Sequence, residues 1–152
     1  MSNSAELVVF TLDEQRYALH LSAVERVVRA VEVTPLPKAP EIAIGVINVQ
    51  GHIIPVLNIR KRFLLPEREI EVSDYFIIAN TLTRTVALVV DEVSGVAKCS
   101  EEQLTAAKKI LPGMEYVEGV LKLEDGMILI HDLDTFLSLE EEEALEDAIS
   151  KI

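Results

Sequence analysis

The chain has 152 residues, of which 49% are hydrophobic and 26% charged, a length and composition typical of one globular domain or two very small ones. Its net charge of −12 disfavours binding to nucleic acid or to an anionic membrane surface. A single cysteine, Cys99, excludes an internal disulfide and is typical of a reducing, cytoplasmic setting. Valine and isoleucine are abundant and aromatic residues make up only 5%, which favours strands.

Five short strands are predicted in the first half. Apolar, β-branched runs between turn residues define them as Leu7–Leu12, Tyr17–Leu21, Val24–Val33 (with a helical turn), Ile42–Val49 and His52–Ile59. The last two are separated by Gln50 and Gly51, where the glycine supplies the positive φ of a tight turn. The first half therefore reads as hairpins joined by irregular segments, one of them the Pro-rich stretch 34–40.

The second half contains a matching set of elements. Its predicted strands are Tyr75–Asn80, Thr85–Asp91, Val93–Lys98, Tyr116–Leu123 and Met127–His131. Two helices are also expected, Glu101–Lys109 after Ser100 as N-cap, and Glu140–Ile152. In front of the second helix, Ser138 and Glu141 have the spacing of a capping box.

These matching elements reflect an internal repeat. When the chain is aligned with itself, one block places Leu7 on Phe76 and continues without a gap to Val27 on Val96. A second block, with a slightly larger displacement, places Gly45 on Gly119, so one insertion is expected between residues 96 and 119. Chance matching is the alternative in a chain so rich in valine and isoleucine. Two ungapped blocks in the same order favour duplication, and five strands per half predict two small barrels that must pack together for stability.

Residues typical of enzymes are sparse. The sequence contains no P-loop, no G-x-S-x-G, no C-x-x-C and no H-E-x-x-H motif. The three histidines lie far apart in the sequence, and the repeat pairs His20 with Val89 and His131 with Leu57, which favours structural roles. His131 followed by Asp132 is the one pair that suggests a metal-dependent enzyme. The pattern as a whole predicts no catalytic residues, no cofactor and no metal.

Several stretches resemble the CheW family of chemotaxis coupling proteins. The resemblance covers residues 7–137, and the segment 45–56, Gly-Val-Ile-Asn-Val-Gln-Gly-His-Ile-Ile-Pro-Val, carries most of it. The other matching segments are Val9–Leu12 with Tyr17 and Val24, Ile59–Phe63, Ala87–Val93 and Gly119–Leu133.

The resemblance implies a mainly β fold of two five-stranded SH3-like β-barrels in pseudo-twofold relation, with short helices including a C-terminal one. It implies a single CheW-like domain over residues 1–152, with subdomain 1 at 15–73 and subdomain 2 at 6–14 plus 74–152. It further implies a cytoplasmic, non-enzymatic adaptor. Its partners would be the cytoplasmic tip of a chemoreceptor and the regulatory domain of the histidine kinase CheA, and it would reach receptor arrays at the inner membrane through them.

Site residues are expected on two surfaces. The groove between the barrels is predicted to bind the receptor through Val24, Arg26, Val27, Val46, Gln50 and Gly51. Apolar residues beside the Pro-rich stretch are predicted to bind the kinase, namely Val31, Val33, Ile42 and Ile44.

Three departures from the family pattern affect the receptor surface. Gln50 stands where the family usually has Arg, Arg26 where it usually has Glu, and Asn58 where Asp is common. Gln50 provides neither the charge nor the fork of donors of an arginine. An auxiliary CheW-like scaffold of another chemosensory-type two-component pathway, serving a divergent receptor, is therefore an alternative. A non-chemotactic interaction module and a metal-dependent enzyme around His131 and Asp132 are more distant ones.

Overall fold

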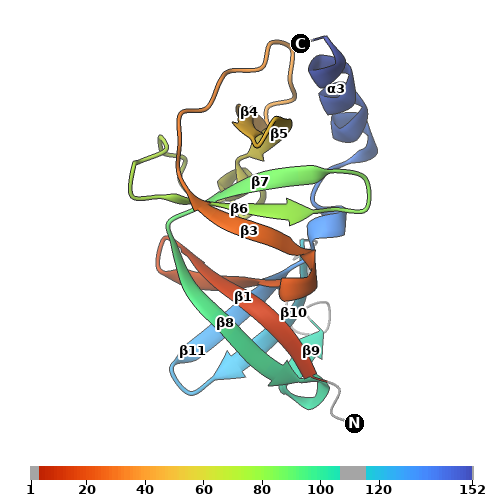
Figure 1. Ribbon diagram of the computed structural model, residues 1–152. Helices are drawn as coiled ribbons and strands as arrows, with labels where there is room; N and C mark the ends of the chain where they lie inside the picture. Colours follow the sequence, from red (N-terminus) through yellow and green to blue (C-terminus); the bar gives the residue numbers. More distant parts are fainter. Residues whose placement is uncertain (1–3, 107–115, 152) are drawn as a thin grey trace.

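Two β-sheets, one above the other in Figure 1, make up most of the computed structural model, which describes residues 4–106 and 116–151. Sheet A has the strand order β8-β1-β2-β11-β10-β9 and sheet B the order β3-β6-β7-β5-β4. The strands of sheet A are β1 (Ser4–Leu12), β2 (Gln15–His20), β8 (Glu92–Ser100), β9 (Leu104–Ala106), β10 (Val117–Leu123) and β11 (Gly126–His131). Those of sheet B are β3 (Val24–Arg29), β4 (Ala43–Val49), β5 (His52–Leu57), β6 (Tyr75–Asn80) and β7 (Thr85–Val90).

Helices are short except at the C-terminal end of the chain. They are η1 (Leu21–Ala23), α1 (Ile59–Arg62), η2 (Glu101–Gln103), η3 (Leu133–Thr135) and α3 (Leu139–Ser150). Within the described residues, no helix is both long and apolar enough to span a membrane.

The two sheets are related by the sequence repeat. Strands β1, β2, β8, β10 and β11 of sheet A correspond to β6, β7, β3, β4 and β5 of sheet B, and with this substitution the two strand orders become identical. Even the bulges correspond, because the register shift between Ala43 and Gly45 in β4 recurs between Val117 and Gly119 in β10. The predicted pair of SH3-like barrels in pseudo-twofold relation is thereby confirmed, with β9 as an additional short edge strand.

Each barrel combines strands from both halves of the sequence. The hairpin β1–β2 pairs with β8 and β11 from the second half, and β6–β7 pairs with β3 and β5 from the first. This differs from the predicted subdomains 15–73 and 6–14 plus 74–152, because residues 15–20 lie in sheet A and residues 75–90 in sheet B. The parallel pairings responsible join strands far apart in the chain and leave no local mark in the sequence.

Three apolar clusters hold the fold together. Sheet A surrounds a cluster of Leu7, Val9, Ala18, Cys99, Leu121, Ile128 and Ile130. Sheet B surrounds Ile47, Ile54, Val56, Phe76, Ile78 and Ala87, which are the repeat counterparts of the sheet A residues other than Cys99. A third and larger cluster includes Phe10 and Leu19 from sheet A, Leu57 and Leu88 from sheet B, and Leu145 from α3. Alternating strand residues thus face either their own barrel or the other sheet.

The C-terminal helix has the predicted capping box. The Ser138 side chain accepts the Glu141 N–H at 3.1 Å, and the Glu141 carboxylate accepts the Ser138 N–H at 2.9 Å. Leu145 and Ala148 are buried, Ile149 is half-buried, and the predicted Ile152 lies outside the described residues. The helix lies beside sheet B in Figure 1.

The predicted helix Glu101–Lys109 is wrong over its described part. Residues 101–103 form a single 3-10 turn, residues 104–106 form β9, and residues 107–109 lie outside the described part of the chain. Thr105 pairs with Val120, as Thr34 pairs with Val46 in the first half, so sheet pairing overrides the local helical propensity. Thr34 aligns with Thr105 at a displacement that lies between those of the two ungapped blocks. The second half therefore contains two short insertions, one before Thr105 and one after it, instead of the single insertion that was predicted.

Candidate binding surfaces

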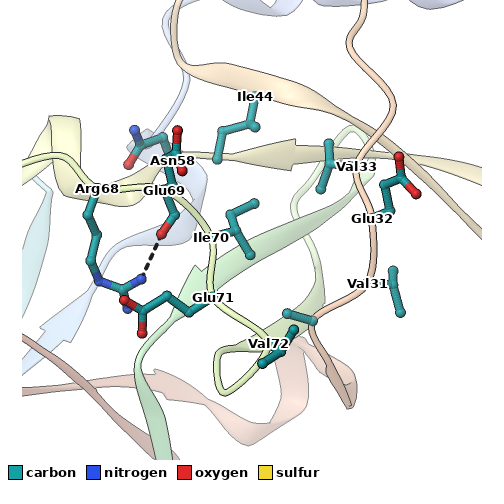
Figure 2. Close-up of a pocket in the computed structure, with 11 residues that line it drawn as sticks. Val31, Glu32, Val33, Ile44, Asn58, Arg68, Glu69, Ile70, Glu71 and Val72 are labelled. Atoms are coloured by element: carbon teal, nitrogen blue, oxygen red, sulfur yellow. Dashed lines mark hydrogen bonds between the residues drawn. The ribbon is translucent and has the colours of Figure 1, made fainter.

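Two hollows on the surface of sheet B are candidate binding sites, and the larger of the two lies at the end of β3. We call it the β3–β4 pocket; it has a volume of roughly 540 Å³ and its wall is shown in Figure 2. Its lining residues are Ala30, Val31, Glu32, Val33, Ile44, Asn58, Arg68, Glu69, Ile70, Glu71 and Val72. Five of these are Val or Ile, and Val31, Ile44 and Val72 are 54%, 37% and 88% exposed. Exposed apolar side chains gathered in a concave surface are typical of a site that binds another protein.

A bulge in β4 turns Ile44 towards this pocket. The register shift between Ala43 and Gly45 leaves Ile44 without a partner on β5 and re-aims its side chain. Gly45 also lets the chain after β3 approach β4, because a Cβ at this position would overlap the Thr34 carbonyl oxygen. Thr34 and Val46 consequently exchange two backbone hydrogen bonds of 2.9 and 2.8 Å, which hold the Val31–Val33 wall in place.

Ion pairs anchor the opposite wall, formed by residues 68–72. Arg68 donates to both oxygens of the buried Asp74 at 2.9 and 2.7 Å and to Asp91 at 2.6 Å. Asp74 also accepts the Glu71 N–H at 2.8 Å. The bonds to Asp74 are the main reason why the pKa of Arg68 is raised above its usual value. Its charge is therefore engaged inside the protein instead of in the pocket.

Arg60 connects this wall to sheet A. Its side chain is 7% exposed and donates two hydrogen bonds to Asp91, at 2.7 and 2.9 Å, and one to Asp13 at 2.9 Å. It also donates to the Pro66 carbonyl oxygen at 3.0 Å. Partial burial opposes ionisation of Asp91, but hydrogen bonds from the Asp13 N–H, Arg60 and Arg68 outweigh it and lower the pKa of this carboxyl. Nothing in the basic run 60–62 of the sequence indicates that Arg60 is buried.

A second hollow lies at the β4–β5 turn and has a volume of about 400 Å³. We call it the turn groove; it is lined by Glu25, Arg26, Val49, Gln50, His52, Ile53, Ile54, Pro55, Arg84, Thr85 and Ile149. Gln50 and Gly51 have φ values of 51° and 86°, as in a tight hairpin turn with two positive-φ residues. Asn48 accepts the Gly51 N–H at 2.8 Å and stabilises this turn.

Two of the predicted receptor residues meet in the turn groove. Arg26 Nη2 lies 3.4 Å from Gln50 Oε1, so the two departures from the family pattern contact each other. Val27 is 38% exposed on β3, whereas Val24 is half-buried against the core between the sheets. Val46 is 7% exposed and belongs to that core, which places it out of reach of a partner.

Sequence reasoning missed one counterpart of Val27. Val96 lies on β8 at the position that the repeat relates to Val27, and it is 55% exposed. Both residues stand on edge strands, β3 of sheet B and β8 of sheet A. The first block of the repeat already paired them, but exposure cannot be read from a repeat.

Three of the four predicted kinase residues meet in the β3–β4 pocket. Val31, Val33 and Ile44 all line it (Figure 2). Ile42 is 1% exposed and packs in the core between the sheets, so its predicted surface role is wrong. The bulge explains the difference, because it brings Ile44 to the surface while Ile42 stays inside.

His131 is a buried residue of the core. Its ring lies edge-on to Phe63 and Phe136, with centroids 5.2 Å away in each case, and neither nitrogen has a hydrogen-bond partner. Burial lowers the pKa of His131 to about 3. Nowhere in residues 4–106 and 116–151 do three His, Cys, Asp or Glu side chains gather in a way that fits a metal ion. Nothing in this arrangement supports the alternative of a metal site around His131 and Asp132.

Taken together, the duplicated barrels and their surface hollows define a class of protein, a pair of SH3-like β-barrels with partly apolar surface hollows. The family model of the CheW-like domain matches residues 6–141. The chain is 31% identical to the chemotaxis protein CheW of Rhizobium meliloti (strain 1021) over 141 residues, covering 91% of each chain, and 31% identical to that of Thermotoga maritima, covering 87% of each.

A solved structure agrees with these relatives. The crystal structure of the scaffolding protein TtCheW from Thermoanaerobacter tengcongensis superposes with a TM-score of 0.82 at 32% identity, covering 93% of this chain and 96% of that one. The chain belongs to the CheW-like family of chemotaxis scaffolding proteins.

Proposed function

We propose that this protein is a non-enzymatic adaptor that couples chemoreceptors to the histidine kinase CheA in chemotaxis arrays. The observation that carries the proposal is the β3–β4 pocket, where three of the residues expected to bind the kinase lie together on a rigid barrel. In this proposal the kinase regulatory domain inserts apolar side chains between Val31, Ile44 and Val72. The receptor tip binds elsewhere on the same domain, and the adaptor therefore holds both partners at once.

Binding to the kinase regulatory domain provides the direct test. Ile44→Asp places a charge among the apolar lining residues of the pocket, and we expect it to abolish binding in a titration followed by calorimetry. Leu123→Asp is the matched control, because Leu123 is also 37% exposed but lies on β10 of sheet A. Equal binding by wild type and Ile44→Asp would refute the placement of the kinase.

The receptor contact is proposed for the exposed residues of the edge strands and the turn groove. Val27, Val96 and the Arg26–Gln50 pair offer apolar surface and polar donors to a helical tip. We expect Val27→Asp to abolish capture of the protein by receptor-tip peptide assemblies while the melting temperature stays within a few degrees. Val24→Asp is less informative, because Val24 packs against the core and a charge there also destabilises the fold.

The Arg26–Gln50 contact supports a second candidate, an auxiliary scaffold for a divergent receptor. An arginine at position 50 would meet Arg26 as a like charge, so the two departures form a matched pair. Gln50→Arg combined with Arg26→Glu restores the pattern usual in the family. If the double variant captures a common chemoreceptor tip that the wild type does not, the divergent receptor is the correct assignment.

Reconstitution tests the coupling itself. Kinase, receptor tip and this protein are mixed with ATP, and phosphorylation of the kinase is followed with and without the protein. We expect the protein to make kinase activity dependent on the receptor tip. Because His131 is buried against Phe63 and Phe136, we expect this histidine to take no part in the reaction.

A further inference from the structure

The β3–β4 pocket combines an apolar floor with acidic walls. Glu32 on the segment after β3 and Glu69 and Glu71 on the opposite wall all line it, and all three residues are exposed. Figure 2 shows Glu32 and Glu69 on different sides of the apolar side chains. A partner that fills the pocket therefore places its own surface next to these carboxylates.

No cation in the pocket balances these carboxylates. Among the described residues, Glu32, Glu69 and Glu71 form no ion pair within 4 Å. Arg68 is the one basic residue in the lining, and its guanidinium pairs with Asp74 at 2.7 Å and with Asp91 at 2.6 Å. We call these three glutamates the acidic rim of the pocket. The rim presents negative charge to any partner that binds there.

A second copy of this chain is a poor occupant. Its corresponding surface on sheet A has Ser100 where the pocket has Val31, and Glu118 where the pocket has Ile44. At these two described positions a second copy therefore offers polar side chains, and Glu118 would bring a further acidic group towards the rim. The net charge of −12 adds a general repulsion between copies.

From this charge pattern we infer the chemistry of the partner: the occupant of the β3–β4 pocket is a surface in which apolar side chains are flanked by Lys or Arg residues that face Glu32 and Glu69. The inference rests on the proposed function, in which the kinase regulatory domain binds here. It adds that the acidic rim selects a basic partner and disfavours a second copy of this chain in the pocket. Charges at the rim of an interface steer association and set its salt dependence more than they set the affinity of the buried centre.

The test measures binding of the cognate kinase regulatory domain at low and at high salt. The probe variant Glu32→Gln/Glu69→Gln neutralises two carboxylates of the rim and leaves the apolar floor intact. The matched control, Glu102→Gln/Glu124→Gln, removes two exposed carboxylates from the segments around sheet A. Both variants have the same net charge, so any difference between them comes from the position of the charges.

We expect wild-type binding to weaken on the order of tenfold between 50 mM and 500 mM salt. The rim variant should bind weakly at both salt concentrations and show little salt dependence, while the control behaves as wild type. Sedimentation should find the wild-type protein monomeric, and Lys or Arg to Gln changes around the apolar residues of the kinase surface should reproduce the effect of the rim variant.

The outcomes separate the inference from the proposed function. If the rim variant and the wild type bind equally at both salt concentrations while Ile44→Asp abolishes binding, the pocket binds the kinase but the basic partner surface is refuted. A wild-type dimer that Ile44→Asp converts to monomers would show that a second copy is the occupant. If the wild type does not bind the kinase domain at either salt concentration, the proposed function fails and the inference fails with it.

Discussion

The two barrels share their interior and differ at their surface. Apart from Cys99, their inner clusters correspond residue by residue, from Leu7 and Phe76 to Ile130 and Val56, and their strand orders and bulges coincide. At the bulge, however, sheet B exposes Ile44 and sheet A exposes Glu118, which contacts His20. The fold requires the apolar positions in both barrels, whereas the bulge residue points outward and is free to diverge. At this position the described residues therefore give sheet B an apolar pocket wall and sheet A a charged surface.

The largest effect is expected where the barrels differ in charge. Arg60 is buried between Asp13 and Asp91, while its repeat counterpart in the second half, Asp134, is exposed. Arg60→Ala removes three hydrogen bonds to carboxylates, leaves Asp13 without its ion-pair partner and leaves Asp91 with Arg68 alone, and it should lower the free energy of unfolding by about 3–5 kcal/mol. Urea denaturation measures this loss, and Arg16→Ala, which removes an exposed pair with Asp125, is the control and should change little. A small effect of Arg60→Ala would mean that the network is not what joins the pocket wall to sheet A.

This network also predicts a pH dependence. Because the folded-state pKa of Asp91 lies below its unfolded value, its contribution is fully present above the unfolded pKa of about 3.9 and is lost as the pH falls through the folded pKa. Unfolding free energies measured from pH 5 down to pH 2 should therefore fall more steeply in the wild type than in Asp91→Asn. If the unfolding free energies of the two proteins fall in parallel, ionised Asp91 does not stabilise the fold as predicted.

The next effect concerns the close approach of the chain to β4. Gly45→Ala places a methyl group against the Thr34 carbonyl oxygen and should break the two hydrogen bonds between Thr34 and Val46. At about 1 kcal/mol for each hydrogen bond, we expect a loss of roughly 2 kcal/mol in thermal or urea unfolding. Kinase binding should weaken as well, because the Val31–Val33 wall moves. Gly51→Ala, with open space around its Cβ but a φ of 86°, is the control and should leave the pocket intact.

A smaller effect of opposite sign is expected at the core position where the halves differ. His131 occupies the place that Leu57 has in the other barrel, and both of its nitrogens are buried without a partner. His131→Leu should stabilise the fold by about 1 kcal/mol because it removes that desolvation cost.

The pH dependence of the unfolding free energy shows whether His131→Leu stabilises the fold by removing the buried imidazole or by improving the packing. The folded-state pKa of His131 is depressed to about 3 from 6.5, so the unfolded chain binds the extra proton first, and stability falls as the pH drops from about 6.5 towards 3. His131→Leu should remove this decline above about pH 5, where Asp91 does not yet titrate. An unchanged slope would show that His131 gains a partner in solution.

The smallest change in stability is expected for a variant that makes the ends of the two barrels alike. Ser100→Val/Glu118→Ile gives sheet A the residues of the β3–β4 pocket, and surface positions such as these shift stability within about 0.5 kcal/mol. We expect a new tendency to self-associate at high concentration, measured by sedimentation. If the variant stays monomeric, the two apolar side chains are not sufficient for protein binding, and the wall formed by residues 68–72 of sheet B is also required.

Much of the fold could be predicted because it depends on local pattern. Alternating apolar residues and turn glycines identify the hairpin at Gln50–Gly51, and the Ser138–Glu141 spacing identifies the start of α3. The prediction was wrong for Glu101–Lys109, where pairing with β10 overrides local propensity. Arg60 was missed because nothing in a basic run signals that Asp13 and Asp91 converge on its first residue.

The candidate surfaces were only partly predictable for a similar reason. Ile42 and Ile44 are alike in the sequence, yet one is 1% and the other 37% exposed, because a bulge between Ala43 and Gly45 changes which side chain faces outward. Val46 and Val27 were both predicted to contact the receptor, but their exposure differs. Val46 is buried in the core between the sheets, whereas Val27 is exposed on an edge strand.

The amino-acid pattern by itself determined that this protein is a duplicated, strand-rich scaffold without the motifs of an enzyme, because repeats, periodicity and caps act between neighbouring residues. Tertiary structure alone decided that the hairpins are exchanged between the barrels, that Arg60 holds their junction, and that one barrel end carries an apolar pocket with an acidic rim. These features arise from contacts between segments far apart in the chain, such as Asp13 and Arg60, whose register is set by the folded sheets.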